Sequence, residues 1–240
     1  MVMLLHKDAH LLIYFGDVAN SFEGDFLAHS SSRQVRDVSS RLRLLQEFLE
    51  VDQLFFLRQT HSDQGITVSG ELFVEPQEGD FLVTDRKNSG LGVYTADCLP
   101  VVLYDSLNNT VGICHAGWIG SVTGVTLRAL ERMVKEYGTV LDKVQVFFGP
   151  SAQVCCYEVQ ESFLLNLEPF SFKKQVIRER EGKLYFDLPL FNKLLLEKEG
   201  VNPESFITAY TLCTICTESY CSSRRSGGRK ERQVSIVALR

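Results

Sequence analysis

The sequence predicts an α+β fold built around a mixed β-sheet. Short apolar runs rich in β-forming residues recur along the chain, and amphipathic helical patterns lie between some of them. Several successive runs are joined only by short polar turns such as "DRKNSG" (85–90) and "DSLNN" (105–109). Strict alternation of strand and helix would instead be typical of a doubly wound sheet. Glycine-rich phosphate loops of the G-x-G-x-x-G or Walker type are absent from the sequence.

Ten runs are predicted to be strands because each combines β-branched, aromatic and aliphatic residues over a few positions. In chain order they are "HLLIYF" (10–15), "LFFL" (54–57), "DFLVT" (80–84), "LGVYT" (91–95), "VVLYD" (101–105), "TVGIC" (110–114), "VQVFFG" (144–149), "LYFDL" (184–188), "FITAYTL" (206–212) and "VSIVAL" (234–239).

Four segments have helical periodicity. Residues 31–50 carry apolar side chains at three- and four-residue spacings, namely Val35, Val38, Leu42, Leu45 and Phe48. Residues 121–138 repeat the pattern and end at a glycine, with an inner face of Val125, Leu127, Leu130 and Val134. Residues 160–167 and 190–200 are shorter candidate helices.

The composition predicts one soluble domain. No linker divides residues 1–240, and 45% hydrophobic with 23% charged residues is typical of a globular protein. The net charge of −5 argues against general attraction to nucleic acid or anionic membranes. The first fifteen residues lack the continuous apolar core of a signal peptide, so the seven cysteines are expected to be reduced thiols in the cytoplasm.

Three potential metal ligands follow predicted strands. His61 follows the run 54–57, Cys98 follows 91–95, and His115 comes directly after 110–114. If these strands share a sheet and run in the same direction, the three side chains converge at one edge. A buried thiol and two hydrogen-bonded histidines are the alternative that the positions alone leave open.

Two histidines and a cysteine form a donor set with a characteristic chemistry. Three protein ligands leave the fourth tetrahedral position open, as in catalytic zinc sites, where the metal acidifies water or polarises a substrate oxygen. Copper also uses this set. However, five histidines cannot supply a trinuclear copper cluster as well, and an axial ligand would have to come from Met1, Met3 or Met133. Zinc is therefore the predicted metal, and copper the alternative.

Other residues extend this candidate site. Asp97 either caps a turn or acts as an acid or base, and Gly117 allows close approach of the backbone. Arg58, Arg224 and Arg225 are predicted to bind phosphate or a carboxylate, because guanidinium groups recognise oxyanions in a bidentate manner. A solvated loop is the alternative for the arginine-rich segment 222–233.

The remaining cysteine motifs are predicted to be structural. Buried thiols are favoured for Cys155 and Cys156 over a strained vicinal disulfide. "CTIC" (213–216) has the C-x-x-C spacing of redox and metal sites, but it lacks a second C-x-x-C, which favours structural packing.

Six motifs together resemble one family in order and spacing. They are "RQTHS" (58–62), "TADCLPVVLYD" (95–105), "HAGWIG" (115–120), "GPSAQVCCYEV" (149–159), "CTIC" with "SSRR" (213–225), and "RQVSIVAL" (232–239). The chain thus resembles the laccase-domain family, also labelled multicopper polyphenol oxidoreductase and sometimes peptidoglycan editing factor. The resemblance runs from about residue 54 to the C-terminus.

This resemblance implies a single compact domain with α/β/β/α layers and one zinc ion held by His61, Cys98 and His115. Members are described as purine nucleoside phosphorylases that also deaminate adenosine and phosphorolyse methylthioadenosine, so nucleoside and phosphate are the implied small-molecule partners. The chain departs from the family pattern in three places: Ile119 replaces an arginine, residues 14–26 lack the usual arginine and glycines, and Glu231-Arg232 occupies the place of a glycine-arginine pair, unless Gly228-Arg229 serves instead.

Two further functions remain open alternatives. One is a copper-dependent polyphenol oxidase. The other is a cysteine hydrolase or amidase that edits peptidoglycan precursors, with Cys98 as nucleophile and His61 or His115 as base.

Overall fold

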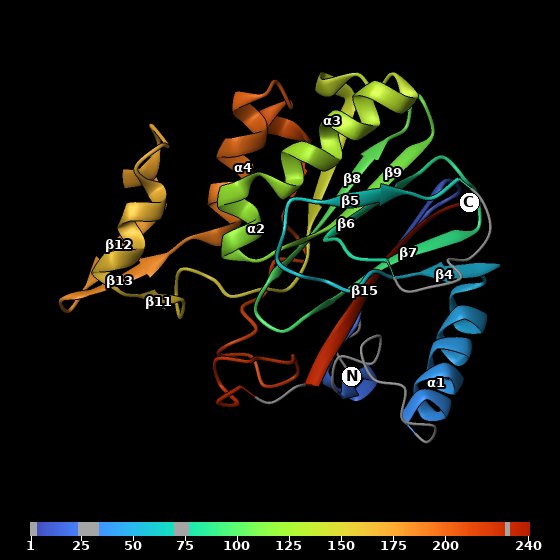
Figure 1. Cartoon of the computed structure of the whole chain (residues 1–240), viewed down its shortest axis with the longest axis horizontal. Helices are drawn as coiled ribbons and strands as arrows, with labels where there is room; N and C mark the ends of the chain where they lie inside the picture. The colour runs from blue at the N-terminus through green and yellow to red at the C-terminus, as the bar shows by residue number, and fades with distance from the viewer. Residues whose placement is uncertain (1–3, 24–33, 70–76, 229–230) are drawn as a thin grey trace.

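Two mixed six-stranded sheets form the centre of the molecule (Figure 1). The computed structural model describes residues 4–23, 34–69, 77–228 and 231–240. Sheet I has the order β1 (Leu4–Lys7), β2 (Leu11–Phe15), β15 (Glu231–Leu239), β7 (Ser89–Thr95) and β4 (Gln53–Phe55), with β3 (Phe22–Glu23) also paired to β15. Sheet II has the order β14 (Phe206–Ile207), β10 (Val144–Phe148), β8 (Leu99–Asp105), β9 (Thr110–Ala116), β6 (Phe81–Thr84) and β5 (Gly65–Thr67).

Both sheets combine parallel and antiparallel pairs, which confirms the predicted mixed topology. The β4–β7, β5–β6 and β10–β14 pairs are parallel, and the other described pairs of these sheets are antiparallel. A small antiparallel sheet of β11 (Glu158–Val159), β13 (Lys183–Phe186) and β12 (Ile177–Arg180) lies at one end of the molecule (Figure 1).

The helices are α1 (Gln34–Leu49), α2 (Trp118–Thr123), α3 (Val125–Tyr137) and α4 (Leu188–Lys198). The predicted helix 121–138 is two helices, because Gly124 takes a left-handed φ of 93° that ends α2 and precedes α3. Short 3-10 turns occur at Val18–Asn20, Leu141–Lys143, Glu161–Leu167, Lys173–Gln175 and Pro203–Ser205. The predicted helix 160–167 is therefore a 3-10 segment, and of the predicted strand 206–212 only Phe206–Ile207 is extended.

Side-chain alternation on β8 shows how the layers pack. Val101 and Leu103 face the core that sheet II shares with α3 and α4, whereas Val102 and Tyr104 face the core between the two sheets. Helix α1 covers the outer face of sheet I (Figure 1), where Leu49 is buried. The α/β/β/α order implied by the family resemblance is thus confirmed.

Two predicted core positions are wrong. Phe48 and Val134 are exposed, and on α3 the buried position is taken by the neighbouring Met133. None of the helices in the described ranges is long and apolar enough to cross a membrane.

Candidate metal centre and its pocket

The three potential ligands meet where the chain crosses between the sheets. Cys98 lies in the connection from β7 in sheet I to β8 in sheet II, and His115 lies near the end of β9, opposite Pro100 of β8. His61 comes from the loop between β4 and β5 and has a left-handed φ of 59°. The premise that the three strands share one sheet is wrong, because β4 and β7 belong to sheet I whereas β9 belongs to sheet II, and His115 lies within β9. The predicted convergence nevertheless occurs.

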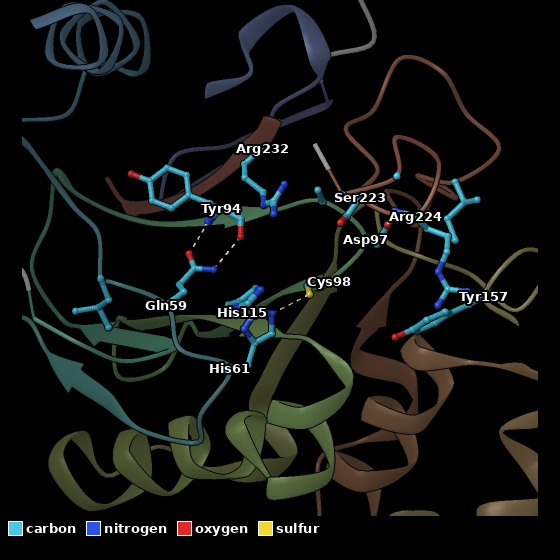
Figure 2. A pocket seen from close by; sticks show the side chains of 15 residues that line it. Gln59, His61, Tyr94, Asp97, Cys98, His115, Tyr157, Ser223, Arg224 and Arg232 are labelled. Atoms are coloured by element: carbon cyan, nitrogen blue, oxygen red, sulfur yellow. Dashed lines mark hydrogen bonds between the residues drawn. The ribbon is translucent and has the colours of Figure 1, made fainter. Parts of the chain in front are cut away.

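The donor atoms of these residues lie close together (Figure 2). One ligand atom from each of His61, Cys98 and His115 lies within 4.8 Å of the others, and the Cys98 Sγ is 3.8 Å from His61 Nε2. The two imidazole rings are edge to face, with centroids 4.8 Å apart. Cys98 is half-buried, His115 is buried and His61 is exposed, so the cluster opens to solvent on one side.

Asp80, just before β6, orients both histidines. Its Oδ1 is 2.8 Å from His115 Nδ1, which leaves the Nε2 of that ring directed to the cluster. The same carboxylate accepts backbone N–H groups from Thr60, His61 and Ser62 at 3.2, 3.1 and 2.6 Å. One buried carboxylate therefore fixes the ring of His115 and the loop that carries His61.

A glycine makes room for the ligands. A Cβ atom on Gly117 would lie 2.9 Å from Cys98 Sγ and 3.0 Å from His61 Cδ2. These distances are shorter than ordinary van der Waals contacts, so any side chain at position 117 would displace a donor atom. The backbone at Gly117 therefore approaches Cys98 and His61 closely, as the sequence predicted.

The charges of the cluster are coupled. Burial raises the pKa of the Cys98 thiol, but His115 and His61 outweigh it and lower that pKa to about 6. Burial lowers the pKa of His115, but the Cys98 thiolate and Asp80 raise it to about 9. Burial also raises the pKa of Asp80, and the hydrogen bonds from His115 and Ser62 lower it to about 2. At neutral pH the cluster is thus a thiolate beside an imidazolium, with Asp80 ionised.

The residues fit a metal ion such as zinc. Tetrahedral zinc, with Zn–S of about 2.3 Å and Zn–N of about 2.0 Å, separates sulfur and nitrogen ligands by roughly 3.5 Å. The observed separation of 3.8 Å between Cys98 Sγ and His61 Nε2 is close to this. A ligating histidine also commonly donates its other N–H to a carboxylate, as His115 is placed to do to Asp80.

The donor cluster lines a pocket of about 810 Å³ (Figure 2). Its other walls come from β7 and β15 of sheet I and from the loops after β4, β7, β10 and β14. They comprise Leu57, Gln59, Tyr94, Ala96, Asp97, Tyr157, Ile215, Ser223, Arg224, Gly227, Gly228 and Arg232. The side-chain amide of Gln59 donates to Tyr94 O at 2.8 Å and accepts from Tyr94 N at 2.7 Å. These two hydrogen bonds hold the loop that carries Gln59 against the end of β7.

Asp97 holds the connection between β14 and β15 at two points. It has a left-handed φ of 86°, and its Oδ1 accepts from the Thr214 hydroxyl while its Oδ2 accepts from the backbone N–H of Arg224, both at 2.7 Å. Both carboxylate oxygens are therefore engaged with residues that follow β14.

The arginines predicted for the site separate into two groups. Arg224 lines the pocket, and its guanidinium lies 5.4 Å from the centre of the Tyr157 ring. Arg58 instead pairs with Glu78, and Arg225 donates to backbone carbonyls of residues 214–220. Neither of these two is among the lining residues. Arg232 lines the pocket in addition, at the place where the family has its glycine-arginine pair.

Sequence reasoning missed several functional positions. Asp80 had one signal, an acidic residue at the start of an otherwise apolar strand. Gln59, Tyr94, Tyr157 and Ser223 had none, because only the tertiary fold brings them to the pocket.

Of the departures from the family pattern, Ile119 is exposed and, like residues 14–23, is not part of the pocket lining. Residues 24–26 and Arg229 lie outside the described residues.

The other predicted cysteine roles need correction. Cys155 is exposed and Cys156 only half-buried, so these are not buried thiols. Cys216 is exposed as well, while Cys213 is buried. All seven cysteines are free thiols in the structure.

Comparisons with known proteins show which family, relatives and solved structures this chain is similar to. A family model described as multi-copper polyphenol oxidoreductase laccase matches residues 19–240. A purine nucleoside phosphorylase of Clostridium acetobutylicum is 29% identical over 96% of this chain and 93% of its own length. An adenosine deaminase named RL5, from an unknown prokaryotic organism, is 32% identical over 88% of this chain and 85% of its own. The crystal structure of YlmD from Geobacillus stearothermophilus covers the whole chain and 99% of its own, with a TM-score of 0.84 at 22% identity.

Proposed function

The chain belongs to the multi-copper polyphenol oxidoreductase laccase family, and on this premise we propose that it is a zinc-dependent purine nucleoside phosphorylase. We propose further that it deaminates adenosine and phosphorolyses methylthioadenosine. The observation that carries the proposal is the His61–Cys98–His115 donor set, with its open side in a pocket that also contains arginine side chains. The names of the related phosphorylase and deaminase support it.

The metal would be held by His61, Cys98 and His115. When bound, zinc supplies Lewis-acid polarisation of an oxygen ligand at its open position. Asp80 keeps the proton of His115 on Nδ1, because that nitrogen faces its carboxylate at 2.8 Å. Cys98 enters the site as a thiolate already at neutral pH, since its pKa is lowered to about 6.

Phosphorolysis brings a phosphate oxygen to the anomeric carbon of a nucleoside while the bond to the purine breaks. Arg224 and Arg232 line the pocket and supply positive charge for phosphate. Tyr94 and Tyr157 line the same pocket and offer aromatic surfaces for a purine ring. Asp97 stays a candidate acid or base, but its contacts support a role in positioning Arg224, whose backbone N–H it accepts at 2.7 Å.

The proposal is tested with inosine, adenosine and methylthioadenosine, each with and without phosphate, on zinc-loaded protein. Phosphate-dependent release of free base is the expected result, with ammonia release from adenosine as the second activity. Cys98→Ser should lose turnover and the zinc ion held by this donor set, whereas Cys221→Ala, which removes a buried thiol outside the pocket, should keep both. Zinc-loaded protein that turns over none of the three nucleosides would refute the proposal.

A thiol-dependent hydrolase is the second candidate function, favoured by one observation. Cys98 and His115 form a thiolate–imidazolium pair, the state in which a cysteine acts as a nucleophile. Activity that survives a chelator and is abolished by iodoacetamide would support this alternative over the metal enzyme.

Copper oxidase chemistry has less support from the described residues. The structure describes two other histidines, His6 on β1 and His10 just before β2. Neither belongs to the donor set of the pocket. Met133 is the one methionine among the described residues, and its side chain on α3 is buried in the core that this helix shares with sheet II. Metal analysis of protein prepared without added metal separates the two: stoichiometric copper with a strong visible band would favour the oxidase.

A further inference from the structure

A second group of cysteine side chains lies apart from the donor set of the pocket. The sulfur atoms of Cys155, Cys156, Cys213 and Cys216 all lie within 4.8 Å of one another. All four are free thiols. Their residues come from two segments that are more than fifty positions apart in the sequence, so the fold itself brings them together.

The parallel pairing of β10 and β14 places these segments side by side. Val146 and Phe147 of β10 lie opposite Phe206 and Ile207 of β14. The loops that follow remain in contact: the Ser151 N–H donates to Leu212 O, and the Thr214 N–H donates to Ser151 O, both at 3.0 Å. Cys155 and Cys156 follow Ser151 in the loop after β10. Cys213 lies between Leu212 and Thr214 in the loop after β14, and Cys216 follows shortly after.

Each pair of cysteines lies on a hydrogen-bonded turn. The Cys156 N–H donates to Gln153 O at 2.9 Å, and the Thr217 N–H donates to Cys213 O at 3.1 Å. These turns hold the two cysteines of each segment close to one another.

Positive charge is fixed on the backbone of both segments. The Arg180 guanidinium donates to the carbonyl oxygens of Val154 and Cys155 at 3.3 and 2.8 Å. The Arg225 guanidinium donates to Ile215 O at 2.9 Å and to Thr217 O at 3.3 Å. Four thiolates around a divalent ion leave two negative charges, and these two guanidinium groups offset them.

We propose that Cys155, Cys156, Cys213 and Cys216 bind a second Zn²⁺ ion in a closed tetrathiolate site. Four thiolate ligands are typical of structural zinc and leave no open position. With Zn–S of about 2.3 Å, tetrahedral geometry separates the sulfurs by roughly 3.8 Å, in keeping with sulfurs that all lie within 4.8 Å of one another. Hard ions such as Mg²⁺ or Ca²⁺ disfavour an all-sulfur set.

The position of this site gives it a structural consequence. Thr214, inside the C-x-x-C segment, donates to Asp97 at 2.7 Å, and Ile215 lines the pocket. Arg225, which holds the carbonyls of this segment, is adjacent to the pocket residue Arg224. The second zinc ion thus holds together the loops after β10 and β14, which form one wall of the pocket. Its four ligands are not among the residues that line the pocket.

The test counts metal ions per chain. The full chain is purified under reducing conditions, loaded with zinc, passed through a desalting column and measured by mass spectrometry of the elements. We expect two zinc ions per chain in the wild type, one in Cys155→Ser/Cys216→Ser and one in Cys98→Ser. The control Cys221→Ala, a buried thiol outside both clusters, should keep two. Circular dichroism establishes that each variant is folded.

Cobalt substitution gives a second measurement that does not depend on the double variant folding. The sulfur-to-cobalt absorption band grows with the number of thiolate ligands, so a four-cysteine site should dominate the wild-type spectrum and persist in Cys98→Ser. Saturation of the wild type at one cobalt or zinc ion that Cys98→Ser loses and the double variant keeps would overturn the proposal. So would two zinc ions in the folded double variant, iron as the bound metal, or loss of two hydrogen atoms by disulfide formation under reducing conditions.

Discussion

At the scale of single residues, Asp80 and Gly117 decide the geometry of the donor set. Asp80 is buried and accepts hydrogen bonds from the loop of His61 while it faces His115. Gly117 leaves the space in which Cys98 and His61 approach each other. Neither is a ligand, yet each fixes where the ligands can lie. Outer contacts of this kind commonly change metal affinity by about 10–100-fold when they are lost.

In the metal-free protein, Cys98 should remain reactive well below the ordinary pKa of a thiol. Its pKa is lowered from 9.0 to about 6, so the thiolate persists as the pH falls from 9 to 7 and is lost only as the pH passes through about 6. The measurement is the rate of iodoacetamide labelling of the Cys98 peptide against pH, by mass spectrometry. Cys114 is an internal control, because burial raises the pKa of its thiol. A Cys98 rate that falls tenfold per pH unit below pH 9 would contradict the pairing.

Gly117→Ala should weaken zinc binding by about 10–100-fold, the loss typical of a disturbed outer contact. The added methyl group would lie 2.9 Å from Cys98 Sγ and must displace a ligand. Competition with a zinc chelator of known affinity measures the change. Ile119→Ala, two residues further on in α2 and with an exposed side chain, is the matched control and should bind like the wild type. Unchanged affinity in Gly117→Ala would show that the donor atoms have more room than the structure gives them.

At the scale of the elements, buried polar contacts connect the helices beneath the pocket. Asn192 of α4 is buried, and its amide donates to the Ser121 hydroxyl of α2 at 2.9 Å and to Leu188 O at 3.0 Å. Helix α2 begins directly after Gly117. The packing of α4 therefore helps to hold the turn that passes the metal ligands.

Asn192→Leu should lower the free energy of unfolding by about 1–3 kcal/mol, because it leaves the buried Ser121 hydroxyl without this partner. Urea denaturation followed by circular dichroism measures the loss. Lys198→Ala, on the exposed end of the same helix, should change stability by less than about 0.5 kcal/mol. Equal stability of the two variants would mean that the contact between α2 and α4 contributes nothing.

The elements also show what the sequence could and could not predict. Strands β8 and β9 were found because their apolar residues are continuous, as both faces of sheet II are covered. Strand β12 was not found, because its "IRER" is largely exposed and carries no such signal. The break at Gly124 was missed because the helical periodicity continues across it.

The same limit applies within the site. The three ligands could be identified by residue type, but Asp80 is recognised only when β6 pairs with β9 and brings it to His115. Arg224 and Arg225 are adjacent, and one lines the pocket while the other holds backbone carbonyls. Sequence alone does not indicate which neighbour in a loop points inward.

At the scale of the whole molecule, Asp80 ties stability to pH. Its folded-state pKa of about 2 lies below the ordinary 3.8, so the unfolded chain takes up the proton first. The stabilisation is therefore present above pH 4 and is lost as the pH falls towards 2. We expect the free energy of unfolding of the metal-free wild type to exceed that of Asp80→Asn by about 2–3 kcal/mol at pH 7, with the difference shrinking between pH 4 and pH 2.

Urea denaturation of both metal-free proteins at pH 7, 4 and 3 tests this expectation. Asp52→Asn provides the control, since Asp52 is an exposed carboxylate between α1 and β4 and is not part of the pocket lining. A difference between wild type and Asp80→Asn that does not vary with pH would show that the charge of this carboxylate does not stabilise the fold.

The arrangement of the layers explains why the pocket lies where it does. His115 follows the alternation of Val111 and Ile113 towards the space between the sheets, whereas Cys114 and Ala116 face the helices. His61, Cys98 and His115 thus line a pocket that is also surrounded by loops from both sheets (Figure 2).

The alternation along β9 also limits how this protein can evolve. Cys114 and His115 are neighbours in the chain, yet the Cys114 thiol is buried in an apolar core and the His115 side chain lines the pocket. Inserting one residue before Cys114 would exchange these faces while leaving the composition almost unchanged. Point substitutions elsewhere on β9 can accumulate one at a time, whereas a change in its length cannot. Natural variation in this strand should therefore consist of replacements, with insertions and deletions confined to the turn at 106–109.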